Sequence, residues 1–267
     1  FGNLKKIFTV MRGHLVVSTG IPSHGKSNFV EWYVMNIMKD YNMKASFFSP
    51  EHHPMALHQT TFIEKFFGKN FFMDNAGLPR VSKEEILRYK NWAQERLYTT
   101  APEDGKFPTW DWLMEKFKEQ MFIYGVDIFV IDAFNKLDYD SNKDSELSRI
   151  KRVLTQLTMF AQMNNVIIFL IAHPTKMQKN EAGIYNKPTL YDISGSADFR
   201  NQAHDGFTIY RHFENVQEGD RFIDKNQVEF VTQKVKMKFQ GEMSQRELFN
   251  YHLPSGRYYA GANPPSF

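Results

Sequence analysis

The sequence predicts an α/β protein with a mostly parallel central sheet, helices on both faces, and antiparallel strands added towards the C-terminus. Three observations predict this class. The apolar run at residues 14–19 passes through a glycine-rich turn into a helical pattern, and the runs at 126–132 and 166–172 are dominated by Ile, Val, Phe and Leu. Nearly continuous apolar runs of this length are typical of parallel strands buried on both faces.

A helix and a second strand follow the glycine-rich turn. Apolar residues at helical spacing from Lys26 onward predict a helix, and residues 45–50 have the length of a buried strand. Residues 54–124 are then mostly helical in pattern, with glycine and proline breaks at Gly68, residues 77–79 and residues 102–108. We therefore expect a helical insertion, about residues 54–124, between two strands of the sheet.

The second half of the chain continues the alternation and then changes to strands. Residues 147–161 repeat apolar side chains at helical spacing, between the two buried runs named above. Alternating patterns predict strands at 206–211, 228–239 and 247–252, and the last two are consistent with an antiparallel hairpin.

Composition excludes several classes of function. The 267 residues are 42% hydrophobic and include 25 Phe and 13 Met, which is enough to build a sizeable core of bulky side chains. Cysteine is absent from the sequence, which excludes disulfides, zinc ribbons and thiol catalysis. A net charge of +3 is too small to indicate nucleic-acid binding without local basic clusters. With no long apolar run or signal-peptide pattern, we expect a cytoplasmic protein that does not bind membranes.

Residues 20–27 read Gly-Ile-Pro-Ser-His-Gly-Lys-Ser, the pattern of a phosphate-binding P-loop. In such a loop the backbone N–H groups and the helix N-terminus surround a phosphate chain, Lys26 reaches the outer phosphates, and the Ser27 hydroxyl binds magnesium. The sequence therefore predicts ATP and Mg²⁺ as ligands, and the alternative is a glycine-rich turn without a ligand. The expected nucleotide contacts are Gly20, Ser23, His24, Gly25, Lys26, Ser27 and Asn28.

Two carboxylates follow predicted strands. Asp132 ends the apolar run at 126–132 and has the form of a Walker B residue that holds magnesium together with Ser27; the alternative is a turn or helix-cap aspartate. Glu51 follows the strand at 45–50, on the edge of the sheet where a base for ATP hydrolysis belongs. By position alone, an exposed loop glutamate is an equally good interpretation of Glu51.

Histidines give a weaker signal. His173 follows the strand at 166–172, where an imidazole could contact the γ-phosphate, although histidines at strand ends are also common without such a role. His52, His53 and His58 could form a metal cluster, but without further ligand spacing a polar loop is the better interpretation.

Lys234, Lys236 and Lys238 alternate along the predicted strand at 228–239, so we expect all three on one face of that strand. Two interpretations stay open. The lysines could protect an edge strand from aggregation, or they could contact phosphate.

Taken together, six segments resemble DnaB-type replicative helicases, in which they occur in the same order. The chain is especially similar to the RecA-like domain of phage primase-helicases and mitochondrial Twinkle, and the likeness covers almost its whole length. The segments are residues 20–27, Ser49-Pro50-Glu51, Ile131-Asp132, Ala172-His173-Pro174, residues 192–198 and Lys236-Met237-Lys238-Phe239-Gln240-Gly241.

The resemblance implies roles for these residues. Glu51 would be the catalytic glutamate, Asp132 the Walker B acid, and His173 the γ-phosphate sensor. The family works as a ring, commonly a hexamer, with ATP between subunits and single-stranded DNA in the central channel. A Lys and an Arg two residues apart reach the neighbour's nucleotide in this family, and here the pair is Lys236 and Lys238. Because ammonium lacks the planar fork of guanidinium, Lys238 would be a weaker finger, or another residue such as Arg246 replaces it.

The resemblance also implies that DNA is held by loops facing the channel, through phosphate charge and backbone amides. The alternative is that their basic residues are ordinary solvated side chains. The loops are residues 135–144, residues 174–188 with Lys176 and Lys179, and residues 192–203 with Arg200.

These observations favour an ATP-driven ring helicase motor that unwinds DNA in replication, from a phage or similar element and hence in the host cytoplasm. A RecA-like ATPase that loads or scaffolds on DNA without unwinding is the alternative, and a small-molecule kinase lacks support from an Arg-rich lid. We expect a motor domain at residues 14–260, a lead-in at 1–13 and a tail at 261–267. Because the chain begins with Phe1, we expect a longer polypeptide that could carry a primase domain upstream.

Overall fold

The computed structural model describes residues 4–73, 79–102, 108–137, 145–175, 177, 179, 183, 185–194 and 196–261. The helices in these ranges are α1 (Leu4–Ile7), α2 (Lys26–Tyr41), α3 (Met55–Phe67), α4 (Lys83–Ala93), α5 (Trp110–Tyr124), α6 (Glu146–Asn164) and α7 (Ser196–Gln202). The strands are β1 (Leu15–Thr19), β2 (Ala45–Phe48), β3 (Leu97–Thr99), β4 (Ile128–Ile131), β5 (Ile167–Ile171), β6 (Asp205–Arg211), β7 (Val216–Glu218), β8 (Arg221–Ile223), β9 (Gln227–Lys234), β10 (Arg246–His252) and β11 (Arg257–Tyr259).

A nine-stranded sheet forms the centre of the molecule, in the order β11-β10-β9-β6-β1-β5-β4-β2-β3. The six strands from β6 to β3 are parallel. The remaining strands, β9, β10 and β11, join by antiparallel pairing. The predicted α/β class, with a mostly parallel sheet and antiparallel strands added near the C-terminus, is confirmed.

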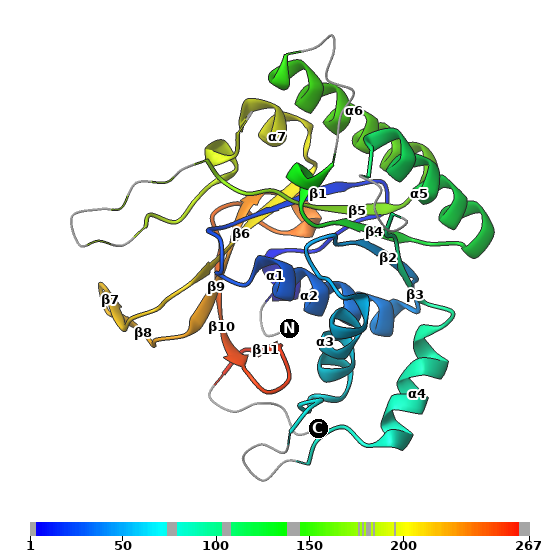
Figure 1. The fold of residues 1–267 in the computed structure, drawn as a ribbon. Coiled ribbons are helices and arrows are strands. Elements are labelled where there is room, and N and C mark those ends of the chain that lie inside the picture. Colours follow the sequence, from blue (N-terminus) through cyan, green and yellow to red (C-terminus); the bar gives the residue numbers. More distant parts are fainter. Residues whose placement is uncertain are drawn as a thin grey trace.

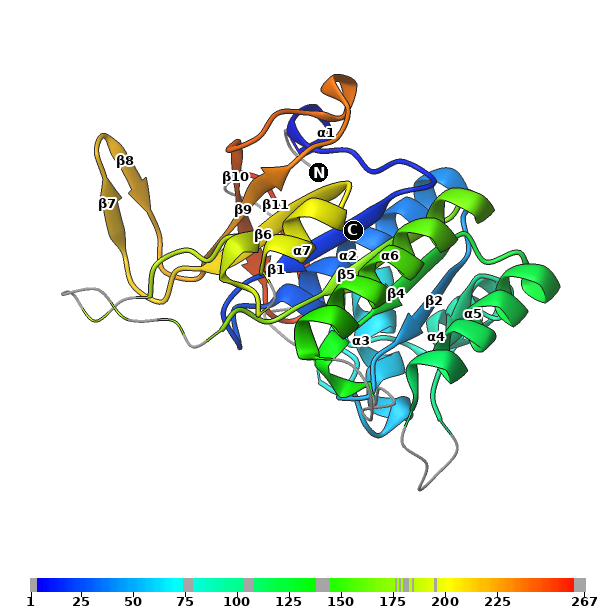
Figure 2. The same cartoon turned by 90° about the horizontal axis from the view of Figure 1, so that it is seen from above.

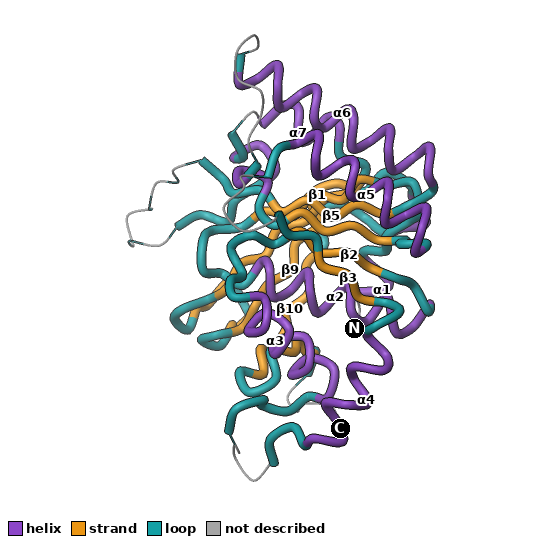
Figure 3. Tube along the Cα trace, turned by 45° about the vertical axis from the view of Figure 1, so that its right-hand side comes forward, coloured by secondary structure: helices purple, strands orange, loops and turns teal. Residues whose placement is uncertain are grey.

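Helices cover both faces of this sheet (Figures 1 and 3). Side chains of successive strand residues point to opposite faces, so each buried strand feeds two cores. Val16 and Phe169 pack in the core beneath α2, α3 and α4, whereas Val17 and Leu170 pack in the core beneath α5, α6 and α7. Such two-sided burial explains why the strands have nearly continuous apolar sequences.

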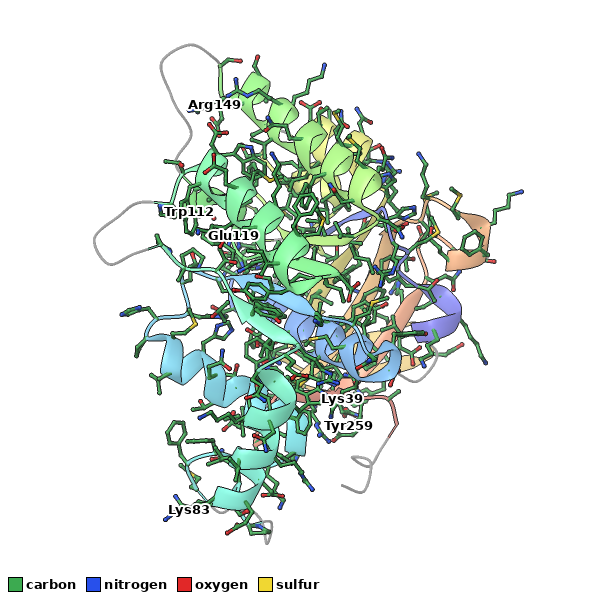
Figure 4. All side chains as sticks on the ribbon, turned by 90° about the vertical axis from the view of Figure 1, so that its right-hand side faces the viewer. Lys39, Lys83, Trp112, Glu119, Arg149 and Tyr259 are labelled. Carbon is green, nitrogen blue, oxygen red and sulfur yellow. The ribbon has the colours of Figure 1, made fainter. Side chains whose placement is uncertain are left out.

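The two helical layers extend to different ends of the molecule. Figure 4 shows Lys83, at the start of α4, and Arg149, in the first turn of α6, at opposite ends. The two-stranded β7–β8 hairpin projects away from the main sheet (Figure 2). In the described part of the chain, no helix is both long and apolar enough to cross a bilayer.

Two details differ from the sequence prediction. Residues 54–124 are not only helical, because Leu97–Thr99 forms β3 and pairs with β2 at the edge of the sheet. The predicted strand at 228–239 is wrong beyond Lys234: β9 ends there, and Lys238–Gln240 forms a 3-10 turn. The reason is that Asp205 binds the Lys236 N–H at 3.0 Å, which takes the backbone out of the ladder.

The two ends of the chain are described in part. Residues 1–3 of the expected lead-in and residues 262–267 of the expected tail lie outside the described residues. Within the lead-in, Leu4 and Phe8 are buried and belong to the core beneath α2. At least these two residues therefore pack as part of the same fold as the sheet.

Candidate nucleotide-binding site

The P-loop connects β1 to α2, and its glycines are needed by the backbone. Gly25 precedes the first residue of α2 with φ +88°, a left-handed conformation that glycine adopts without strain. At Gly20, a Cβ atom would collide with the carbonyl oxygen of Ile209 on β6. Close packing of the loop against β6 therefore requires glycine there.

Lys26 and Ser27 begin α2, facing the carboxylate that follows β4. The buried Lys26 ammonium donates to the carbonyl oxygen of Ile21 at 3.1 Å, and burial lowers its pKa to about 8, although Asp132 and Glu51 act to raise it. Ser27 is hydrogen-bonded to Asp132, whose pKa is raised by burial. Ser27 and Asp132 are oxygen donors of the kind that Mg²⁺ prefers, and the buried Lys26 charge fits a polyphosphate.

One cavity of about 630 Å³ collects most of the predicted site. Glu51 and His173 line it with the P-loop, because the carboxyl ends of the parallel strands β1, β2 and β5 share one edge of the sheet. The strand-end residues thus lie at one place, as their positions in the sequence predict. From the predicted set, the lining residues are Ser23, Gly25, Lys26, Ser27, Asn28, Glu51 and His173.

His24 and Asn28 face neighbouring strands. His24 Nδ1 accepts the Arg211 N–H at 3.0 Å, and burial, with the charges of Lys26 and nearby groups, lowers the His24 pKa to about 4. Asn28 donates to the Gly256 carbonyl at 2.9 Å and to the Tyr258 hydroxyl at 3.0 Å. The amide of Asn28 thus braces the P-loop helix against β11, a contact that the motif alone does not predict.

His173 lies between two cavities. Besides the nucleotide cavity, it lines a second cavity of about 390 Å³ together with Asn135, Pro174 and Ser194. These three residues belong to the three loops that the sequence analysis placed near DNA. A shift of the His173 ring would therefore be felt on both sides.

A buried ionic cluster forms one wall of the nucleotide cavity. Glu31 of α2 is 4% exposed; its Oε1 lies 2.6 Å from His58 Nε2, and its Oε2 accepts from Lys65 Nζ at 2.8 Å. His52 Nδ1 lies 3.0 Å from His58 Nε2 and 3.4 Å from Glu31 Oε1. The P-loop motif does not predict Glu31 or Lys65; the available signal was an acidic residue between the apolar residues of α2.

The geometry of this cluster favours hydrogen bonds over a metal ion. Glu31, His52 and His58 offer ligand atoms within 4.8 Å of one another. However, Lys65 and Thr61 already bind the second oxygen of Glu31. His58 Nδ1 is buried and has no hydrogen-bond partner in the described part of the chain, whereas metal-bound histidines usually donate their other N–H. His53, the third histidine of the predicted group, does not belong to the cluster.

The candidate trans residues lie elsewhere. Lys236 and Lys238 are exposed on the irregular turn after β9, and neither is among the described residues that line the nucleotide cavity. Lys234 points to a different use, because its Nζ donates to the Arg200 carbonyl at 2.6 Å. The expected common face of three lysines is therefore wrong. Arg246, the alternative finger, is paired with Glu218 at 2.9 Å.

The predicted DNA contacts are only partly within the described residues. Lys176 lies outside them, as do residues 138–144. Lys179 is exposed, with its ammonium 5.2 Å from the centre of the Tyr185 ring. Arg200 of α7 donates to the Gln233 carbonyl at 3.2 Å, so its guanidinium is partly engaged within the fold.

A P-loop between β1 and α2, a carboxylate after β4 and a mostly parallel sheet define a RecA-like P-loop NTPase domain. The chain belongs to the family of the DnaB-like helicase C terminal domain, whose model matches residues 1–248. This family implies a nucleotide-driven helicase domain.

A curated relative agrees with this family. The chain is 31% identical over 259 residues to the Twinkle homolog protein, chloroplastic/mitochondrial, of Arabidopsis thaliana. That match covers 96% of this chain but 35% of the relative, so the chain spans about a third of its length.

Solved structures show the same fold at low identity. The ATPase domain of one of them matches with a TM-score of 0.72 and 17% identity, covering 95% of this chain and 86% of that one. A DnaB-like replicative helicase, whose structure was described with its interactions with primase, matches with a TM-score of 0.71 and 17% identity, covering 93% and 57% of the two chains.

Proposed function

We propose that this domain is an ATP-dependent ring helicase motor that moves along single-stranded DNA and unwinds duplex DNA in replication. One observation carries the proposal: the Lys26 and Ser27 cradle, Asp132, Glu51 and His173 meet at one edge of the sheet in a DnaB-like domain. The interactions with primase described for one structural relative support a primase partner, in the same polypeptide or separate.

Each residue has a proposed part in hydrolysis. Lys26 and the P-loop amides bind the phosphates, and Ser27 and Asp132 hold Mg²⁺, which neutralises charge on the phosphates when bound. Glu51 orients and deprotonates the attacking water. His173 contacts the γ-phosphate and passes its loss to the loops of the second cavity.

The ring supplies the remaining groups. In a homo-oligomer, as a hexameric ring, Lys236 and Lys238 of one subunit reach the nucleotide of the next. Their exposure on the turn after β9 supports this part of the proposal, because neither side chain is buried within its own subunit.

Replacing Glu51 tests the hydrolytic part of the proposal. Glu51→Gln should keep ATP binding and lower turnover about 10²- to 10⁴-fold, because the amide cannot accept the proton of water. The measurements are nucleotide affinity and ATP hydrolysis with and without single-stranded oligonucleotide. Full hydrolysis by the variant would contradict the role of Glu51.

Strand displacement tests the motor itself. The assembled protein should separate a forked DNA duplex with ATP, and its hydrolysis should rise on addition of single-stranded DNA and fall steeply with salt. DNA-stimulated hydrolysis without strand displacement would favour the loader or scaffold function instead.

A further inference from the structure

The turn that carries Glu51 projects from the sheet. After β2, the His52 N–H donates to the Ser49 carbonyl at 3.0 Å, and Glu51 lies exposed at the tip of this turn. Strand β2 holds only one side of the turn, because the ladder with β4 ends at Phe48. A catalytic carboxylate in such a place needs a second attachment if it is to stay in position.

His52 supplies that attachment. Its Nδ1 lies 3.0 Å from His58 Nε2 and 3.4 Å from Oε1 of Glu31. Glu31 belongs to α2, the helix that begins with Lys26 and Ser27. The contact therefore connects the Glu51 turn to the same rigid element that presents the phosphate-binding side chains.

We propose that His52 is a positioning residue for Glu51, and that its imidazole fastens the Glu51 turn to Glu31 of α2. This inference rests on the proposed role of Glu51 in hydrolysis. His52 acts on the reaction through its neighbour and does not itself exchange a proton with the attacking water.

Glu31 is suited to be the fixed end of this attachment. Lys65 and His58, both from α3 and both buried, hold its two carboxylate oxygens at 2.8 and 2.6 Å. A buried carboxylate with two such partners is strongly disfavoured from moving, because any displacement leaves charge unpaired. His52 is half-buried, so its removal should loosen the Glu51 turn and leave the core cluster intact.

Position matters to the rate because a displacement of about 1 Å in a reacting group can cost about 100-fold. His52→Ala should therefore lower kcat for ATP hydrolysis about 10- to 100-fold and leave KM for ATP within about threefold. His52→Gln, whose side-chain amide can still donate to Glu31, should recover part of the loss. The matched control is His53→Ala, which removes the exposed neighbouring imidazole and should keep kcat within about threefold.

A double-mutant cycle in the same chain, with single-stranded oligonucleotide present, distinguishes positioning from a separate effect. In the Glu51→Gln background, His52→Ala should cause no further loss of turnover. The same fold-loss in both backgrounds, or a rise in KM at unchanged kcat, would overturn the inference. Melting temperatures within a few degrees of the unchanged protein confirm that the variants are folded, and His52→Gln serves if the alanine variant is not.

The outcomes separate this inference from the proposed function. Undiminished hydrolysis by Glu51→Gln would overturn both, whereas an inactive Glu51→Gln beside a fully active His52→Ala would overturn only the role of His52. Zn²⁺ that raises the melting temperature of the unchanged protein, but not of His52→Ala, would assign a metal centre and overturn the hydrogen-bonded network.

Discussion

The nucleotide cavity and the Lys236–Lys238 turn are built by different means, although the resemblance to DnaB-type helicases assigns both to ATP hydrolysis. The cavity lies where parallel strands end together, so strand order alone brings its residues close. The turn leaves the sheet after β9 and depends on polar contacts. Asp205 accepts from the Lys236 N–H at 3.0 Å and from the Gln240 amide at 3.1 Å.

The difference concerns completeness. The cavity already contains buried, interacting groups from one chain, including the Ser27–Asp132 hydrogen bond. The turn instead presents Lys238 and Phe239 to solvent, with Phe239 75% exposed. An exposed cation beside an exposed aromatic ring suits contact with a second copy, whereas the P-loop does not need one to form.

The largest expected effect comes from the cavity. Lys26→Ala should lower ATP turnover by about 10³-fold or more and weaken nucleotide binding, because the ammonium is the buried cation at the phosphate site. Nucleotide affinity and single-turnover hydrolysis measure it. Thr60→Ala on the outer part of α3 is a suitable control, and equal activity of the two variants would contradict the cavity as the nucleotide site.

The turn should give a smaller and assembly-dependent effect. Lys238→Ala should lower turnover roughly 10- to 100-fold in assembled protein, as measured by steady-state ATP hydrolysis. This is less than the roughly 10³-fold or more that an arginine finger contributes, because ammonium binds phosphate as a point charge. Lys238→Arg should keep or raise the rate.

Mixing variants tests whether the turn acts across an interface. Lys238→Ala and Lys26→Ala subunits, each weak alone, should regain part of the turnover when mixed, because an interface then combines an intact cavity with an intact turn. If no mixture exceeds the sum of its components, the trans role of Lys238 is wrong.

The smallest effect concerns stability of the antiparallel half. Burial raises the pKa of Glu229, but hydrogen bonds from His212 and Lys187, with the charges of Lys187 and Arg246, outweigh it and lower the pKa to about 2. A lowered folded-state pKa contributes stability above the ordinary value of 4.5, and this contribution is lost as pH falls towards 2.

Glu229→Gln should therefore reduce the free energy of unfolding by roughly 1–3 kcal/mol at pH 7, and the difference from the unchanged protein should shrink at pH 3. Thermal melting at both pH values measures this. A difference that is constant with pH would show that the Glu229 charge does not stabilise the fold.

The sequence by itself determined the order of strands and helices and the residues of the cavity. Apolar runs and the P-loop motif are local signals, and parallel strands must place Glu51, Asp132 and His173 at the edge occupied by Lys26. The residues of this site could be named before their distances were known because topology, and not side-chain detail, brings them together.

Only the tertiary structure decided the rest. The end of β9 at Lys234, the strand β3 and the Glu31 cluster each depend on partners distant in the sequence. Lys65 reaches Glu31 across 34 residues, and Asp205 reaches the Lys236 N–H across 31. Periodicity within a segment carries no information about such pairs, because their energies arise only when two separate elements pack together.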